Sequence, residues 1–334
     1  MKRYAVALLL PLVASGCHEA HTVPTEIEPL GDGPYAVSST NLEVAAEYAD
    51  IGDDAMHEIL LGQPTASGQL RSLADILKHP ESAFIVDVPV PGDKEIYGPA
   101  RGLILPIVTF LTFPASPRPH SRPYEFPYHD ARYGAFEDML EPGERPRFAN
   151  PGERYPLIIL THGDLAHGLY EVQRAHRLAS HGYVVVVINY GDDRTRQPDQ
   201  LNFHLGYLRP FLTRAVLDAL LASETYGPHI DAENIGIAGH SFGGFTALAI
   251  AGASFQGNKA SVSDERIKAA SIAAPWVGGY DNGDEIYAFG PANADIARVD
   301  IPVISFFGTE DEVALATTIL PAMKLLSGPT YVVE

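Results

Sequence analysis

Cysteine is almost absent from this chain, since Cys17 is the only one among 334 residues. A single cysteine cannot form a disulfide within the chain, and it cannot build a multi-cysteine zinc or iron–sulfur site. Basic side chains are also scarce, with 23 Lys and Arg against 42 Asp and Glu and a formal net charge of -19. Such a surface repels nucleic-acid phosphates and disfavours anionic membranes, unless something other than charge holds the protein there. We therefore expect no nucleic-acid partner.

Histidine is present but unevenly distributed along the sequence. All 13 histidines lie at or before His240, and they lack the spacing of metal ligands. No motif indicates an organic group either, so we expect neither a metal nor a cofactor. Apolar residues make up 46% of the chain and charged residues only 19%, which is enough to bury a sizeable core and argues against a disordered acidic chain.

The first residues have the layout of a bacterial export signal. Two basic residues precede an apolar stretch from Tyr4 to Ala14, which is too short to span a membrane. Small residues lead to Cys17, which resembles the lipobox of bacterial lipoproteins, where the cysteine is lipidated. We expect removal of residues 1–16, a lipid anchor at Cys17 that holds the exported protein on a membrane facing the periplasm or cell exterior, and a tether over residues 17–34. An ordinary secretory signal with a chance cysteine is the alternative.

The first half of the remaining chain has the patterning of short strands. The runs Tyr35–Tyr48, Phe84–Val90 and Leu103–Phe113 are β-like and are separated by Pro, Gly and charged residues. We expect them to form an N-terminal antiparallel part of a sheet. The segment Ala115–Tyr155 is rich in Pro and charged residues and is predicted to be irregular.

The second half alternates apolar strands with helices. Continuous apolar runs at Leu157–Leu160 and Val184–Ile188 indicate strands covered on both faces. Further strands are predicted at residues 235–238, 269–274, 302–307 and 331–333, and helices at 169–181, 207–226, 242–253 and 312–326. This alternation predicts right-handed crossovers and a parallel sheet. We therefore expect one α/β domain over residues 35–334, a mostly parallel twisted sheet with helices on both faces.

The sequence Gly239-His240-Ser241-Phe242-Gly243 fits the Gly-x-Ser-x-Gly pattern of a nucleophile elbow. An apolar strand precedes it and an Ala- and Gly-rich helix follows it, as the motif requires. The sharp turn would lift the Ser241 hydroxyl above the sheet, and the positive end of the helix would stabilise negative charge there. The pattern also occurs by chance, so a structural turn serine is the alternative. We predict that Ser241 is a nucleophile.

These features resemble the α/β-hydrolase superfamily, and within it the bacterial dienelactone-hydrolase-like and platelet-activating-factor-acetylhydrolase-like serine esterases. The resemblance rests on Tyr155–Gly163, Leu178–Val185, Gly239–Gly244 and Ile301–Asp311, which occur in the family's order. It implies the α/β-hydrolase fold and the cleavage of carboxylic esters through an acyl-enzyme. True dienelactone hydrolases use a cysteine nucleophile, so the serine favours the esterase branch.

The resemblance also implies the remaining site residues. One oxyanion N–H is expected from Phe242, and a second from Asp164 in the loop after the first buried strand. An acidic side chain there is a departure from the family, because it would repel an oxyanion unless turned to solvent. We expect His162 to organise this loop rather than to act as the base. Asp311 is the predicted triad acid, with a solvated acidic loop as the alternative.

The catalytic base is the residue that the sequence does not supply. In the family the triad histidine follows the acid, yet no histidine follows Ser241 here. We expect that the C-terminal end of the domain is missing from this chain. The leading hypothesis is a secreted or lipid-anchored serine hydrolase that acts on small-molecule or lipid-like esters. The alternative is a catalytically impaired, hydrolase-fold lipoprotein that binds a ligand, and a peptidase or C–C hydrolase of the same fold also remains open.

Overall fold

The computed structural model describes residues 30–63, 71–129, 134–197, 202–255, 260–281, 284–286 and 288–334. Residues Asp32–Glu334 form one compact unit. The predicted signal peptide, Cys17 and most of the predicted tether lie outside the described residues. Within the described part of the chain, no helix is both long and apolar enough to cross a bilayer.

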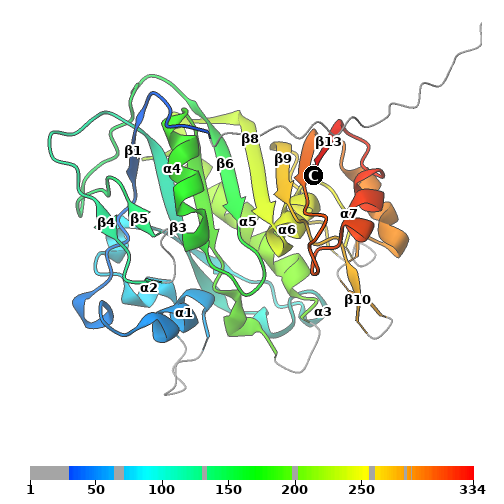
Figure 1. Cartoon of the computed structure of the whole chain (residues 1–334). Coiled ribbons are helices and arrows are strands. Elements are labelled where there is room, and N and C mark those ends of the chain that lie inside the picture. Colours follow the sequence, from blue (N-terminus) through cyan, green and yellow to red (C-terminus); the bar gives the residue numbers. More distant parts are fainter. Residues whose placement is uncertain are drawn as a thin grey trace, which may run out of the picture. The chain divides into compact units, whose positions relative to one another are not determined.

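A nine-stranded sheet forms the centre of this unit (Figure 1). The strands lie in the order β1 (Ala36–Ser39), β3 (Ile104–Ala115), β7 (Val184–Asn189), β6 (Tyr155–Thr161), β8 (Ile230–His240), β9 (Ile267–Ala273), β12 (Val303–Phe306) and β13 (Thr330–Val333), and β2 (Phe84–Pro89) also pairs with β3. All neighbours from β7 to β13 are parallel. In contrast, β1, β2 and β7 run antiparallel to β3. The predicted mostly parallel sheet with an antiparallel N-terminal part is confirmed.

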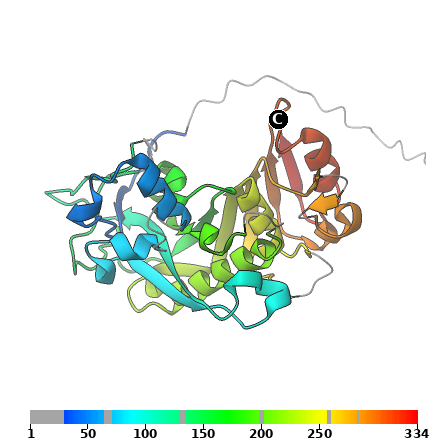
Figure 2. The same ribbon diagram turned by 90° about the horizontal axis from the view of Figure 1, so that it is seen from below.

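Helices cover both faces of the sheet because its central strands carry apolar side chains on both sides. Figures 1 and 2 show α4 (Val172–Ser180) on one face and α5 (Leu205–Ala222) and α6 (Phe242–Ile250) on the other. Val185 and Val187 of β7 belong to the core beneath α4, whereas Val184 and Val186 belong to the core beneath α5 and α6. The continuous apolar run of β7 therefore serves two cores at once, as predicted for a strand buried on both faces.

Several local elements differ from the sequence prediction. The strand expected over Tyr35–Tyr48 ends at Ser39, and a 3-10 turn occupies Ala46–Tyr48. The short helices α1 (Asp53–Leu61), α2 (Leu73–Ile76) and α3 (Lys94–Tyr97) lie where no helix was predicted. The C-terminal helix α7 (Ala316–Met323) is shorter than predicted, and two-residue strands β4 (Tyr124–Glu125) and β5 (Ala135–Phe136) and the pair β10 (Gly279–Asp281) and β11 (Asp284–Ile286) were not predicted. All of these lie outside the parallel strands that position the site.

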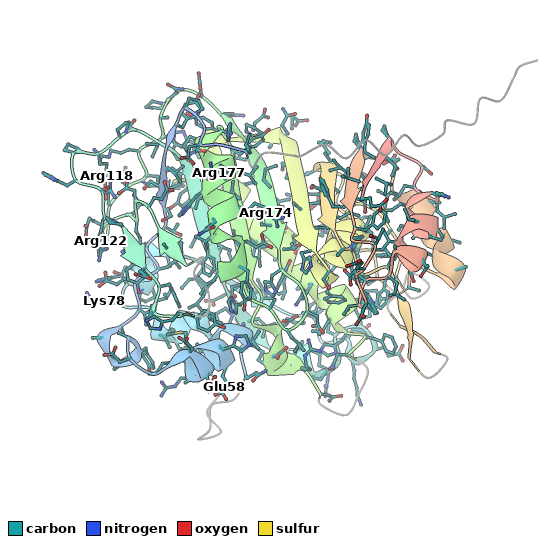
Figure 3. The ribbon with its side chains drawn as sticks, viewed as in Figure 1. Glu58, Lys78, Arg118, Arg122, Arg174 and Arg177 are labelled. Atoms are coloured by element: carbon teal, nitrogen blue, oxygen red, sulfur yellow. The ribbon has the colours of Figure 1, made fainter. Side chains whose placement is uncertain are left out.

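Basic side chains near the N-terminal edge of the sheet are held in ion pairs. Figure 3 shows Lys78, Arg118 and Arg122 on the flank that carries β4 and β5. Lys78 and Arg122 both contact Glu43, and Arg118 contacts Asp138. These three cations are therefore neutralised by neighbouring acids instead of forming a free basic patch.

Among the described residues, no helix covers the C-terminal strands on the sheet face that α4 covers over β3 and β7 (Figures 1 and 2). There Phe306 is 39% exposed and Tyr331 is 63% exposed. The register places Ile304 beside Tyr331 and Phe306 beside Val333. We call these four residues, together with the exposed Ala269 on β9, the open face. It is an apolar strip at one end of the sheet.

Candidate active site

The predicted nucleophile lies in a strained turn between β8 and α6. Ser241 has φ 53° and ψ −119°, a conformation that side-chain-bearing residues rarely adopt. Such a residue costs about 1–3 kcal/mol and persists only where its surroundings hold it. Here the Ser241 N–H donates to the Ala273 carbonyl at 2.9 Å, and its carbonyl accepts from Trp276 N at 2.9 Å. One bond to the end of β9 and one to the segment after it therefore fix the elbow.

Close backbone packing explains the glycines around Ser241. A Cβ on Gly239 would lie 2.3 Å from the Gly243 carbonyl oxygen. A Cβ on Gly243 would lie 2.1 Å from the Thr161 carbonyl oxygen. The Thr161 hydroxyl donates to the carbonyls of Gly243 at 2.9 Å and Ala238 at 3.1 Å. The end of β6 is thereby fastened to the elbow, and the loop that follows β6 must run beside the nucleophile.

The loop His162-Gly163-Asp164 lies next to Ser241. A Cβ on Gly163 would be 3.4 Å from Ser241 Cβ. His162 is buried, its Nδ1 bonds the Gly163 carbonyl at 2.9 Å, and its Nε2 accepts from Tyr190 N at 3.3 Å. Burial and the nearby Arg209 cation lower the pKa of His162 to about 3. With both nitrogens engaged and no charge at neutral pH, His162 organises the loop and has no lone pair to offer Ser241.

The acidic side chain of Asp164 is engaged by a basic residue. Its carboxylate forms an ion pair with Arg196, which also contacts Asp193 at 2.8 Å. Among the described residues, no hydrogen bond engages the Asp164 N–H. The neutralised carboxylate does not repel a forming oxyanion as an unpaired one would, and the amide is available to donate.

A buried ion pair lies behind this loop, and the sequence reasoning did not single it out. Arg209 of α5 is fully buried, and its Nε donates to Asp192 at 2.6 Å. Burial alone would raise the pKa of Asp192, but the Arg209 cation outweighs it and holds this pKa at about 2. Arg209 also donates to the carbonyls of His162 at 2.8 Å and Gly163 at 3.1 Å. An arginine beside the apolar positions Leu208 and Leu212 of this helix is the sequence signal that could have revealed it.

The predicted acid, Asp311, lies in the loop after β12. Its Oδ1 accepts from the N–H groups of Val313 and Ala314, both at 2.8 Å. The segment directly after it borders a cavity of about 210 Å³, opposite Trp276. The cavity is lined mainly by apolar residues, among them Trp276, Val277, Val313, Leu315 and Ile319. Trp276 donates to the Ser241 carbonyl, so a residue bonded to the elbow borders the same cavity as the residues that follow Asp311.

No described histidine forms a hydrogen bond with the Ser241 hydroxyl. His167 is buried, and neither of its ring nitrogens has a hydrogen-bond partner among the described residues. Its ring stacks on that of Tyr170, with 4.3 Å between the ring centroids. Burial lowers the pKa of His167 to about 3, with a further contribution from the neighbouring His162 and His57. His240 is exposed and lies near the buried Glu171, whose pKa is raised by burial. Within the described part of the chain, the predicted nucleophile therefore has no histidine base bonded to it.

A larger hollow lies beside α1. It has a volume of about 480 Å³ and is lined by Asp53, Asp54, His57, Tyr128 and His129. His57 Nδ1 lies 2.9 Å from the Tyr128 hydroxyl, and His129 contacts Asp53. Within the described part of the chain, no cluster of three or more His, Cys, Asp or Glu is arranged to hold a metal ion.

Comparison with known proteins supports the fold. No protein-family model and no curated protein matches the chain. Among solved structures, a ferulic acid esterase from Streptomyces cinnamoneus is similar, with a TM-score of 0.52 and 19% identity over 75% of this chain and 71% of that chain. At this identity the likeness shows the fold alone, which agrees with an α/β hydrolase. The narrower resemblance to dienelactone-hydrolase-like esterases stays a prediction.

Proposed function

We propose that this chain is a serine hydrolase that cleaves carboxylic esters through an acyl-enzyme on Ser241. The observation that carries the proposal is the strained Ser241 held directly beside the Gly163–Asp164 loop. An elbow of this kind next to a donor loop is suited to acyl transfer. The similarity in fold to a protein described as a ferulic acid esterase adds support.

The proposed reaction has two stages. Ser241 Oγ attacks the ester carbonyl while its proton passes to a base, and the carbonyl oxygen becomes an oxyanion that accepts from the Phe242 and Asp164 amides. The carbon–oxygen bond to the alcohol then breaks, and the alcohol leaves with the proton. Water repeats the attack on the acyl-enzyme, which releases the acid and restores the Ser241 hydroxyl. Asp311 is proposed to orient the base.

The cavity of about 210 Å³ beside Trp276 is proposed to receive the acyl group. Val313 and Leu315 line it and are 70% and 45% exposed, so apolar surface faces solvent when the cavity is empty. Burial of such surface against an apolar acyl chain or ring is favourable. Esters with a small apolar acyl group are therefore the proposed substrate class.

The base is proposed to be a histidine on sequence that continues from β13. The strands β8, β12 and β13 are parallel, so a segment that leaves β13 emerges at the same edge of the sheet as Ser241. Such a segment would cover the apolar open face. The alternative, a hydrolase-fold protein that binds without turnover, is favoured by the lack of a base among the described residues.

Labelling with a fluorophosphonate and hydrolysis of a chromogenic acetate ester test these proposals. We expect the chain extended through the codons after Glu334 to be labelled at Ser241 and to hydrolyse the ester. Loss of a triad member costs about four to six powers of ten in rate, so the 334-residue chain should turn over far more slowly. Ser241→Ala should abolish labelling in both. An extended protein that is folded but unlabelled at Ser241 contradicts the esterase proposal and favours the binding protein.

We also propose export and lipid anchoring at Cys17. The support is the sequence alone, namely the short apolar stretch and the single cysteine after small residues. Metabolic labelling with an alkyne fatty acid should mark the wild-type protein, and Cys17→Ala should remove the label. Equal labelling of the two proteins contradicts the anchor.

A further inference from the structure

We infer that Arg209, held by Asp192, is a positioning residue that orients both amide donors of the oxyanion hole. The inference rests on the proposed function, because it concerns the same site. The Nη atoms of Arg209 donate to the carbonyls of His162 and Gly163, and the guanidinium also lies over the Phe242 ring. A single buried side chain thus touches both segments from which the donors come.

Because the peptide bond is planar, these contacts to the carbonyls also fix the direction in which the neighbouring amide N–H groups point. In a trans peptide the C=O and N–H groups point in opposite directions, and the described peptide bonds are all trans. The His162 carbonyl shares its peptide unit with the Gly163 N–H, and the Gly163 carbonyl shares its unit with the Asp164 N–H. Because Arg209 holds both carbonyls, both N–H groups must point away from the guanidinium.

The nucleophile lies directly beside this loop. The Gly163 position is the loop residue whose missing Cβ would be 3.4 Å from Ser241 Cβ. Neither Gly163 N–H nor Asp164 N–H has a hydrogen-bond partner among the described residues. A hydrogen bond from a cation to each carbonyl also polarises the peptide, which strengthens the opposite N–H as a donor. Arg209 therefore sets both the direction and the strength of the loop donors.

The second donor segment is fixed through an aromatic ring. The Arg209 guanidinium carbon lies 4.8 Å from the centroid of the Phe242 ring and 4.9 Å from that of Tyr190. A cation over a desolvated ring face is held there by the ring quadrupole. Since Phe242 is the first residue of α6 and follows Ser241, this contact locks the start of the helix against the loop.

Only a guanidinium can make all of these contacts at once. Its planar fork donates through Nε to Asp192 and through its two Nη atoms to two carbonyls. A lysine ammonium keeps the charge but is a point donor on a flexible stem. Arg209→Lys is therefore the conservative variant that separates charge from orientation. Arg214→Lys on the same helix is the matched control, because Arg214 is half-exposed and pairs with Asp264.

The test combines a kinetic and a structural measurement on the full chain. We expect Arg209→Lys to slow fluorophosphonate labelling of Ser241 by about 10²- to 10³-fold, the usual effect of losing an oxyanion donor. The loss should fall on the maximal labelling rate, with the concentration for half-maximal rate changed less than about threefold, since ground-state binding does not use the donors. Arg214→Lys should match wild type, and added guanidinium should partly restore Arg209→Ala where equal sodium chloride does not.

Crystal structures provide the readout that does not depend on Ser241. In Arg209→Lys, or in Arg209→Met combined with Asp192→Asn if the single variant is unstable, the carbonyls of His162 and Gly163 should leave their wild-type orientation. A loop that keeps its orientation overturns the inference, and so does a rotated loop with labelling within threefold of wild type. If wild-type Ser241 is itself not labelled, the proposed function fails, and the crystal structures alone then decide the positioning.

Discussion

At the scale of single residues, backbone clearance around Ser241 leaves no room for a side chain at Gly243. We predict that Gly243→Ala lowers the free energy of unfolding by at least about 1–3 kcal/mol, because its Cβ would meet the Thr161 oxygen at 2.1 Å. A shift of the elbow by about 1 Å should slow Ser241 labelling about 10²-fold. Gly152→Ala is the control, since nothing lies within 4 Å of its Cβ position. Urea denaturation should show Gly152→Ala unchanged, and equal effects of the two variants would refute the clearance argument.

The buried ion pair makes a second prediction at this scale. Asp192→Ala leaves the Arg209 cation buried without its carboxylate, which should cost about 3–5 kcal/mol of stability. Asp218→Ala should cost no more than about 1 kcal/mol, because its 2.6 Å pair with Arg266 is exposed to solvent. Both are measured by urea denaturation at neutral pH. A cost below about 1 kcal/mol for Asp192→Ala would mean that water or another acid replaces the carboxylate.

The site residues predicted from the sequence belong to motifs of neighbouring residues, whereas those that were missed make contacts with residues far away in the sequence. Ser241 is visible because the elbow needs glycines at fixed positions beside it, and the contacts at Gly239 and Gly243 show why. The ion pair of Asp164 with Arg196 and the bonds of Arg209 to the loop join residues far apart in sequence. No local pattern encodes such pairs, so the orientation of the donors could not be predicted. The roles of Ser241, Asp164, Phe242 and Asp311 stay predictions.

At the scale of elements, the strands of the parallel sheet were predictable and the short helices were not. The strands β6 and β7 are buried on both faces, which forces a continuous apolar run. The helices α2 and α3 have four residues each, barely one turn, so no apolar period can be seen in them. The longer α1 buries Met56, Ile59 and Leu60 at helical spacing, and this pattern was the signal that was overlooked.

The open face gives a prediction about an element that would cover it. In the 334-residue chain, Tyr331→Ser should change the free energy of unfolding by less than about 0.5 kcal/mol, because the side chain is 63% exposed. In the chain extended beyond Glu334, the same variant should cost about 1.5–3 kcal/mol if a segment buries Tyr331. Lys324→Ser on the exposed side of the end of α7 should be neutral in both. A small cost of Tyr331→Ser in the extended chain contradicts a covering segment on this face.

At the scale of the whole molecule, buried neutral histidines tie stability to pH. Burial lowers the pKa of His162 and His167 to about 3 and of His176 to about 4, against 6.5 for an ordinary histidine. Between pH 6.5 and 4 the unfolded chain therefore binds protons that the native protein does not, so these groups make stability fall as pH falls. Glu171, whose pKa is raised by burial, acts in the opposite direction. Asp192 stabilises the native state fully above about pH 4. This stabilisation is lost as the pH falls from about 4 to 2, so Asp192 affects the pH dependence only in that range.

Replacing one of these histidines should reveal how much it contributes to the pH dependence of the free energy of unfolding. His176→Leu should reduce the loss of stability on acidification from pH 6.5 to 4.5 by up to about 1.4 kcal/mol per pH unit, the value for one proton. Urea denaturation at several pH values measures the slope. An identical slope in His176→Leu and wild type would show that His176 binds protons equally in the native and unfolded states.

The pairing of β3 has a consequence for how the chain acquires its structure during synthesis. One edge of β3 is occupied by β1 and β2, which precede it in the chain, but the other edge pairs with β7, where Val108 meets Asn189. During synthesis, the mostly apolar segment Ile107–Phe113 of β3 can therefore pair along one edge only. Its other edge stays unpaired until β7 has been synthesised. Late, long-range pairing of this kind exposes an aggregation-prone strand. The antiparallel region is thus exposed to aggregation until β7 has been synthesised.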